Sequence, residues 1–264
     1  MKFEKQKWKR VALKVVKLLM WICMLSFVVF VLLLSNKDLD DKKCKKVDVY
    51  IYPIDLHFYN RQAVLEVLRK ALGSNQKLIG MEMGEVNVSK LERELKKDPL
   101  LEDAEVFAEM DASLNVKIVQ RRPIIRLVRY DGTQYYVDQY GVKMPLSEQY
   151  SPRLLLANGN IFERFEKGDS VYSFVGNQVF KIASYVDNHP FYKALIEQIF
   201  VRADNDIVLI PKIGSKYVIF GDAQNMDKKF RKLLVFYREG LNRIGWNKYN
   251  SIDVRFDGQV ICKK

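Results

Sequence analysis

The chain has 264 residues, of which 48% are hydrophobic and 12% aromatic, and it carries a formal net charge of +12. Its 3 cysteines include no C-x-x-C pair, which excludes a disulfide framework as the source of its stability. Residues 1–17 hold half of the net charge. The positive charge of the remaining chain is low for a nucleic-acid-binding protein. We read the other basic residues as spread over a solvated surface, with no nucleic-acid partner; an anionic membrane surface or wall polymer stays open as a partner.

A continuous apolar run follows this basic tail. Residues 18–34 read LLMWICMLSFVVFVLLL, without a charge, glycine or proline. With the two valines before Lys17, the run is long enough to cross the roughly 30 Å hydrocarbon core of a membrane as one helix. Its core is also longer than that of a cleaved signal peptide, and no small-x-small cleavage pair follows it. The sequence therefore predicts a membrane anchor that includes Leu18, Trp21, Phe27, Phe30 and Leu34.

The charges around this run predict the topology. Seven basic residues and one acid precede it, which favours a cytoplasmic N-terminus. We therefore expect a cytoplasmic tail over 1–17, a transmembrane helix over 18–34 and everything beyond it outside the cytoplasm. Residues 35–46 (SNKDLDDKKCKK) are too polar to bury themselves and are predicted to form a juxtamembrane stalk. Whether Cys44 pairs with Cys262 stays open.

Residues 47–122 are predicted to form a first domain of order β-α-α-β-β. Alternating apolar residues from Val47 indicate a strand, and Asn60 is a suitable N-cap for a helix over 61–72. A second helix is expected from Ser89, which with Glu92 matches a capping box. Two alternating runs within 104–118 then predict a hairpin. Two helices on one face of a three-stranded sheet can close a core of their own.

Residues 123–264 are predicted to form a second, β-rich domain of antiparallel strands with flanking helices, so that the fold class is α+β. Apolar runs separated by turn residues indicate the strands, and a 3.6-residue period indicates the helices. The expected strands are 124–130, 135–137, 142–144, 196–203, 207–211, 216–220, 251–256 and 259–262, and the expected helices are 177–187 and 226–239.

The sequence offers little basis for catalysis. It contains no G-x-G-x-x-G, P-loop, H-E-x-x-H or G-x-S-x-G motif. His57 and His189 are interpreted as surface or capping residues, and the tyrosines near Tyr135 as strand formers rather than a sugar-stacking platform. The carboxylates around Glu105 lie in mostly solvent-facing places and are not interpreted as an acid–base pair. We predict no enzyme, and no catalytic, cofactor-binding or metal-binding residues, cofactor or small-molecule substrate.

The whole plan resembles the bacterial cell-division family FtsQ/DivIB, in which a POTRA domain runs into a β domain. The most specific stretch is Val86–Leu146, with Arg121-Arg122-Pro123-Ile124 and the later Tyr136-Val137-Asp138-x-x-Gly141-Val142. A second match, at Ser251–Gly258, is similar to the last strand and turn of the family. The two matches occur in the order that the family has.

The resemblance implies a bitopic scaffold of the divisome in the cytoplasmic (inner) membrane at the division septum. It would bind FtsB- and FtsL-like coiled-coil proteins through its β domain, meet other divisome components and link early division proteins to septal wall synthesis. A strand at a sheet edge can accept a partner segment as an extra strand. The predicted partner-binding residues are Ser251, Ile252, Asp253, Val254, Arg255, Phe256 and Asp257. The alternative is a membrane-anchored POTRA subunit of a protein transport or assembly machine, followed by an anchored wall enzyme.

Overall fold

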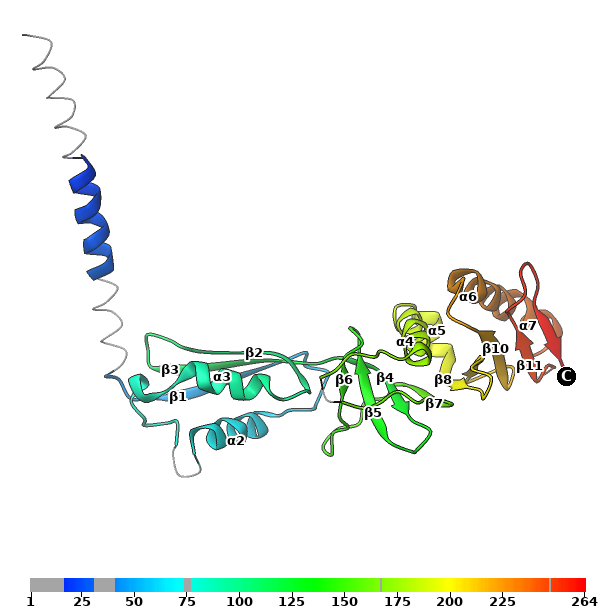
Figure 1. The fold of residues 1–264 in the computed structure, drawn as a ribbon, viewed down its shortest axis with the longest axis horizontal. Helices are drawn as coiled ribbons and strands as arrows, with labels where there is room; N and C mark the ends of the chain where they lie inside the picture. The colour runs from blue at the N-terminus through cyan, green and yellow to red at the C-terminus, as the bar shows by residue number, and fades with distance from the viewer. Residues whose placement is uncertain (1–16, 31–40, 74–76, 167, 247) are drawn as a thin grey trace, which may run out of the picture. The chain divides into compact units, whose positions relative to one another are not determined.

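The computed structural model describes residues 17–30, 41–73, 77–166, 168–246 and 248–264. The chain divides into two compact units, which are described separately (Figure 1). The first unit comprises the described residues of Met1–Tyr50 together with Arg61–Leu95 and Ala104–Lys117. The second comprises Ile51–Asn60, Lys96–Asp103 and Ile118–Lys264.

Residues 17–30 form a helix whose side chains are all exposed (Figure 1). Of the predicted anchor residues, Leu18, Trp21, Phe27 and Phe30 are between 59% and 67% exposed. Leu34 lies outside the described residues. Among the helices that the structure describes, none has both the length and the apolar character needed to cross a bilayer. The transmembrane helix over 18–34 therefore stays a prediction.

The first fold is a three-stranded sheet with two helices, in the predicted order β-α-α-β-β. The sheet order is β1-β3-β2. Period-two alternation buries Leu114, Val116 and Ile118 of the central strand completely, and the two helices bury Leu68 and Leu91. The elements are β1 (Lys46–Tyr52), α2 (Arg61–Leu72), the 3₁₀ turn η1 (Met83–Glu85), α3 (Val88–Lys96), β2 (Leu101–Ala108) and β3 (Ser113–Gln120).

One predicted helix start in this unit is wrong. Helix α3 begins at Val88, so Ser89 lies within the helix and is not its cap. The backbone N–H of Lys90 donates to Oδ1 of Asn87 at 2.9 Å. Asn87, the residue directly before the helix, thus has the capping role that the sequence pattern assigned to Ser89. Both side chains offer an oxygen that can accept such a hydrogen bond.

The second unit is built on a mixed sheet of nine described strands. Their order is β12-β11-β10-β9-β8-β7-β4-β5-β6. The elements are β4 (Pro123–Val128), β5 (Gln134–Asp138), β6 (Lys143–Met144), β7 (Leu155–Gly159), α4 (Phe174–Asp187), α5 (Pro190–Leu195), β8 (Ile196–Val201), β9 (Ile207–Pro211), β10 (Tyr217–Gly221), α6 (Met226–Val235), the π-helical turn η2 (Phe236–Gly240), α7 (Leu241–Ile244), β11 (Ser251–Asp253) and β12 (Ile261–Lys263).

The prediction of a purely antiparallel sheet is wrong at three pairings. Strands β4 and β7, β7 and β8, and β10 and β11 are parallel, whereas the predicted meander β8-β9-β10 is antiparallel. Helices α4 and α5 connect β7 to β8, and α6 to α7 connect β10 to β11. Parallel neighbours need a crossover connection, and the helices between β7 and β8 and between β10 and β11 supply one for two of the three parallel pairs.

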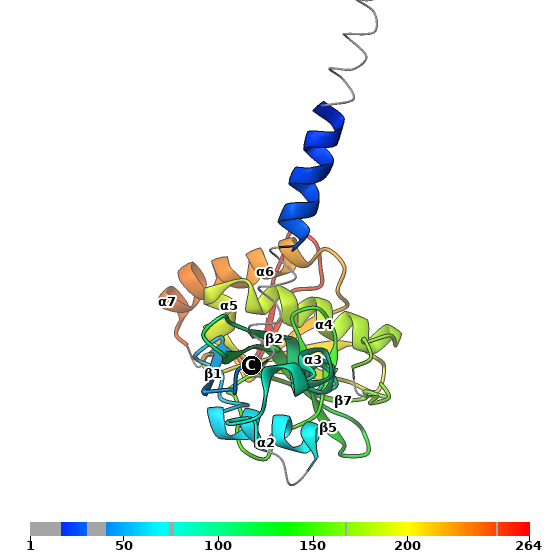
Figure 2. The same cartoon turned by 90° about the vertical axis from the view of Figure 1, so that its left-hand side faces the viewer.

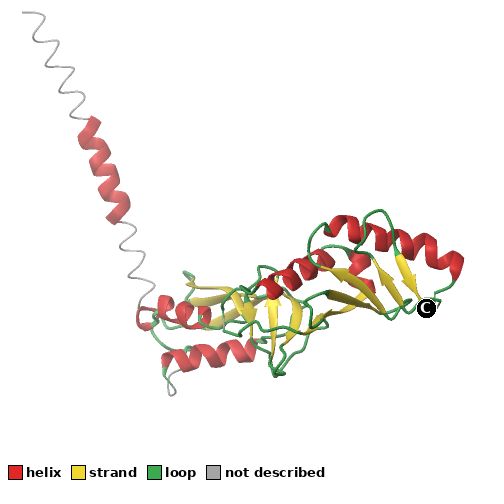
Figure 3. Ribbon diagram, turned by 45° about the vertical axis from the view of Figure 1, so that its right-hand side comes forward, coloured by secondary structure: helices red, strands yellow, loops and turns green. Residues whose placement is uncertain are grey.

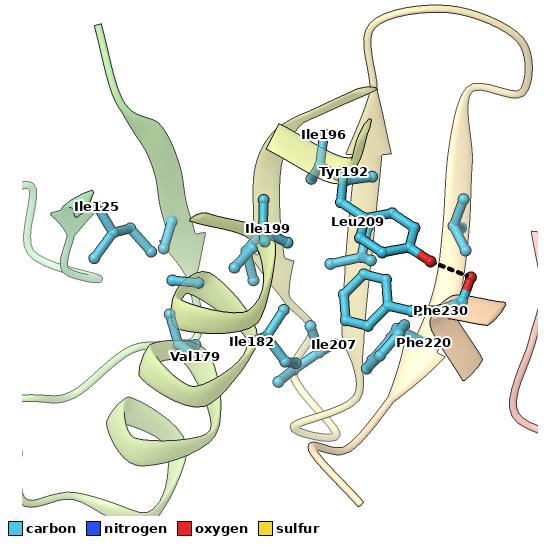
Figure 4. Close-up of a cluster of buried hydrophobic side chains, with 14 of the residues drawn as sticks. Ile125, Val179, Ile182, Tyr192, Ile196, Ile199, Ile207, Leu209, Phe220 and Phe230 are labelled. Carbon is cyan, nitrogen blue, oxygen red and sulfur yellow. Dashed lines mark hydrogen bonds between the residues drawn. The ribbon is translucent and has the colours of Figure 1, made fainter. Parts of the chain in front are cut away.

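Helices α4, α5 and α6 lie over one face of this sheet (Figures 2 and 3). Between helices and sheet lies a large apolar core, which includes Ile182, Ile199, Leu209 and Phe230 (Figure 4). The hydroxyl of the buried Tyr192 donates to the carbonyl of Phe230 at 2.9 Å, which joins α5 to α6. Burying each such side chain stabilises the unit by roughly 1.5–3 kcal/mol.

Helix α4 begins three residues earlier than predicted. The side chain of Ser173 caps it by accepting from the backbone N–H of Gly176 at 3.0 Å. The predicted stop at His189–Pro190 is confirmed, since α4 ends at Asp187. Pro190 then opens α5, a short helix that was not predicted. Proline suits the first helical position because the N–H that it lacks would have no intrahelical partner there.

Candidate protein-interaction surface

One end of the nine-stranded sheet is formed by β11 and β12. Strand β11 pairs with β10 through Tyr217↔Ser251 and its two successors, and with β12 through Ile252↔Cys262 and its two neighbours. The premise that residues 251–257 form the free edge is therefore wrong. The open edge belongs to β12, which pairs with no other strand in the described part of the chain.

The predicted partner-binding residues fall into two groups. Ser251, Ile252, Asp253 and Val254 are at most 8% exposed, and the N–H of Val254 donates to the carbonyl of Ile219 at 3.1 Å. These four residues complete the sheet rather than face a partner. Arg255, Phe256 and Asp257 are exposed, and their role in partner binding stays a prediction.

The predicted strand over 251–256 ends at Asp253 because its carboxylate turns the chain. Oδ1 of Asp253 accepts from the backbone N–H of Arg255 at 3.0 Å, and Oδ2 binds the guanidinium at 2.8 Å. A second carboxylate, that of Asp206, binds the same guanidinium at 2.7 Å. Burial alone would raise the pKa of Asp253, but the hydrogen bonds from Arg255 outweigh it and the pKa lies below its ordinary value.

Beside β12, helix α6 and the loop of the terminal hairpin enclose a groove of 540 Å³. Its apolar side chains include Val235, which is 48% exposed, with Phe236 from the helix side and Val260 from the hairpin. Its rim carries Lys228 and Arg231. We call this feature the α6 groove; its lining is Lys228, Arg231, Lys232, Val235, Phe236, Glu239, Gly240, Asp257, Gly258, Gln259 and Val260.

Lys232 fixes the hairpin against α6. Its ammonium donates to the carbonyl of Val254 at 2.6 Å and also to that of Phe256. Both carbonyls lie just beyond β11, outside its ladder of main-chain hydrogen bonds, and the ammonium supplies the donor that each of them needs. The groove is therefore a preformed feature with an ordered wall. Sequence reasoning missed it, although Val235 and Phe236, two consecutive apolar residues at the end of α6, were a usable signal.

The opposite end of the sheet is closed. Residues 168–171 run beside β6: Lys143 N–H donates to Asp169 at 2.7 Å, Gly168 N–H donates to Lys143 at 3.1 Å, and Val142 bridges Ser170. Beneath this segment, the fully buried side chains of Lys143 and Glu163 form an ion pair of 2.8 Å. The other main-chain edge is thus already occupied by the chain itself.

His189 and two of the tyrosines that were considered for chemistry pack against other parts of the fold. Nδ1 of His189 lies 2.7 Å from the carbonyl of Tyr185, and its ring stacks on the Tyr185 ring at 4.3 Å between centroids. Tyr135 and Tyr136 are at most 1% exposed, which leaves no ring face for a sugar. Of this trio of tyrosines only Tyr140 is exposed, at 62%.

Two family models match the chain. The model described as "FtsQ/DivIB, C-terminal related" matches residues 122–263, which include the whole surface described above. The model described as "POTRA-like domain" matches residues 42–119. No curated protein matches the chain significantly.

Proposed function

Since the chain belongs to the FtsQ/DivIB family and is a division-associated POTRA protein, we propose that it is a bitopic scaffold of the divisome. Its open strand β12 and the α6 groove bind FtsB- and FtsL-like coiled-coil proteins. It sits in the cytoplasmic membrane at the septum through residues 18–34, with both folded units outside the cytoplasm. It links early division proteins to septal wall synthesis and catalyses no reaction.

The observation that supports this proposal most strongly is the open main-chain edge of β12 beside a preformed apolar groove. An edge strand supplies main-chain affinity to an added strand, and an adjoining pocket supplies selectivity through an anchored side chain. The opposite edge offers neither, because residues 168–171 already pair with β6. A partner that adds a strand would therefore dock at the β12 end.

Depletion and co-purification in the native cell test the proposal. Depleting the full-length protein should block septation and produce filaments. Affinity purification of the full chain from solubilised membranes should recover small coiled-coil membrane proteins of the division machinery. Normal septation after depletion would contradict the scaffold role. Recovery of an outer-membrane barrel instead would favour a POTRA subunit of a transport or assembly machine.

The substitution that best probes the surface is Val235→Glu, with Phe174→Glu as its matched control. Val235 is a groove residue, whereas Phe174 is a 76% exposed apolar residue at the start of α4 and lies outside the groove. A substitution at the end of β11, such as Val254→Pro, is unsuitable because the Val254 N–H already donates to the carbonyl of Ile219 in β10. Loss of the partner in both variants, or in neither, would contradict the assignment of the groove.

A further inference from the structure

The net positive charge beyond the N-terminal tail is concentrated near the C-terminus. Residues 212–264 contain twelve basic and five acidic residues, whereas residues 18–211 contain 25 basic and 26 acidic residues. The basic residues themselves occur all along the chain, as expected, and the excess near the C-terminus arises because few acids accompany them there. This last part of the second unit has a strong positive bias, which raises the local concentration of anions.

Part of this charge borders a cleft of 630 Å³ between the β9–β10 connection and the segment after α7. Among the described residues, its lining includes Lys212, Lys216 and Trp246 but no acid. Both lysines are exposed, and Trp246 is 39% exposed. We call it the Trp246 cleft. It differs from the α6 groove, with which it shares no lining residue.

The walls of the Trp246 cleft are held in place from behind by Tyr237. This tyrosine is buried, its hydroxyl donates to the carbonyl of Ile213 at 3.0 Å, and its ring meets that of Trp246 edge to face at 6.0 Å. Gly214 has a φ of +88°, and a Cβ there would lie 3.1 Å from the Tyr237 hydroxyl. The aromatic wall and the lysine-bearing loop are thus fixed to one side chain, so a ligand would meet a preformed cleft.

We propose that the Trp246 cleft binds an acidic sugar unit of the cell wall, namely N-acetylmuramic acid whose lactyl carboxylate is free because it carries no stem peptide. The indole supplies an apolar surface for a sugar ring, and Lys212 and Lys216 supply charge-assisted hydrogen bonds to a carboxylate. The cleft volume is in the range of small-ligand sites. The presence of a wall sugar at this surface rests on the proposed function, which places the unit outside the cytoplasm.

An anionic lipid surface shares the negative charge but fits the cleft less well. The exposed apolar side chains of the lining are Ile213 and Trp246. Stable membrane binding needs a much larger apolar face or a second anchor. A concave site with one aromatic wall and two cations instead suits a single ring that bears one acid group.

Fluorescence of the full chain in detergent micelles tests the proposal. The protein has 3 tryptophans, so Trp8→Phe and Trp21→Phe leave Trp246 as the sole indole. Titration with N-acetylmuramic acid should give a saturable change in its emission. N-acetylglucosamine, which lacks the lactyl carboxylate, should bind roughly three- to tenfold more weakly. Equal affinity for both sugars, or no saturable change with either, would overturn the proposal.

Charge variants separate this site from the partner-binding surface. Lys212→Gln with Lys216→Gln should reduce affinity for N-acetylmuramic acid to that for N-acetylglucosamine, whereas Lys228→Gln with Arg231→Gln should leave it unchanged. The first pair should still co-purify the coiled-coil partners, so a failure of the cleft is distinguishable from a failure of the proposed scaffold role. An emission change that occurs only with phosphatidylglycerol vesicles would assign the charge to a lipid and overturn the sugar site.

Discussion

The two ends of the nine-stranded sheet differ in whether their main-chain edge is covered. At the β6 end, residues 168–171 continue the main-chain pairing, and a buried ion pair between Lys143 and Glu163 lies beneath them. At the β12 end, the last strand pairs on one side, and the hairpin loop that precedes it lines the α6 groove. Exposed strand edges favour aggregation, so a protein that closes one edge and leaves the other open indicates a use for the open one.

The charges at the two ends differ in the same way. Lys143 and Glu163 are both 0% exposed, and Glu163 also accepts from the N–H groups of Tyr172 and Ser173 at 3.2 and 2.8 Å. That carboxylate is therefore committed to holding the connection before α4. The cations around the α6 groove, such as Lys228 and Arg231, are instead exposed to solvent. At the closed end the charged side chains form a buried ion pair within the fold, whereas at the open end they are accessible to a partner.

The largest change in stability is expected from a substitution at the closed end. Glu163→Ala leaves the Lys143 ammonium buried without its counter-ion, which should lower the free energy of unfolding by about 3–5 kcal/mol. The exposed neighbour Glu166 provides the control, since Glu166→Ala should change it by less than about 0.5 kcal/mol. Urea denaturation of the full chain followed by tyrosine fluorescence or circular dichroism measures both. Equal midpoints for the two variants would show that the pair does not hold this end.

The next effect is at the open end. Val235→Glu places a charge in the apolar part of the α6 groove and should weaken partner binding by roughly 2 kcal/mol, which is about 30-fold. Its urea midpoint should stay near that of the wild type because Val235 is half exposed. Quantitative pull-down with the purified partner measures the change. An unaltered affinity together with a normal midpoint would remove the groove from the binding surface.

The pH dependence of stability should distinguish the two ends as well. Burial acts to raise the pKa of Glu163, but hydrogen bonds from Lys143, Ser173 and Tyr172 outweigh it, so the folded pKa lies below the ordinary value of 4.5. The stability from this carboxylate is therefore present above the unfolded pKa and is lost as the pH falls through the folded pKa. The wild type should lose more stability than Glu163→Gln between about pH 6 and pH 3. Parallel curves would contradict this.

The smallest effect concerns the rim of the groove. Lys228→Gln with Arg231→Gln should reduce the partner's association rate and its salt dependence, with a change in affinity of about threefold, because solvent-exposed charges are screened. Stopped-flow or surface-binding kinetics at low and high salt measure this. A change confined to the dissociation rate would mean that the two cations are desolvated in the complex.

Local patterns predicted most elements, because periodicity and turn residues act over a few positions. Helix α2 has the predicted bounds, and the alternation in β3 predicted its buried face. The sheet edge could not be predicted this way. Ser251–Phe256 alternates like an edge strand, yet its position is set by non-local pairing to β10 and β12. Alternation determines which face is buried but not which strands lie alongside.

Side-chain partners were equally beyond local patterns. Lys143 and Glu163 are 20 residues apart and meet only because residues 168–171 fold back on β6. Likewise, Arg255 and Asp206 are far apart in the sequence but form an ion pair. The Lys232 ammonium donates to carbonyls more than twenty positions away. Only the family resemblance, which the family match confirms, directed attention to the C-terminal end before the pairing was known.

If β12 receives a strand from the partner, its main-chain amides become hydrogen-bonded, and amide hydrogen exchange measures this change. Full-length protein is compared alone and in complex with the co-purified coiled-coil proteins. We expect the partner to protect amides of Ile261–Lys263 and to slow exchange in the hairpin loop, while residues 168–171 exchange at the same rate in both samples. Unchanged exchange at β12 in a saturated complex, or protection confined to α2 and α3, would contradict strand addition at β12.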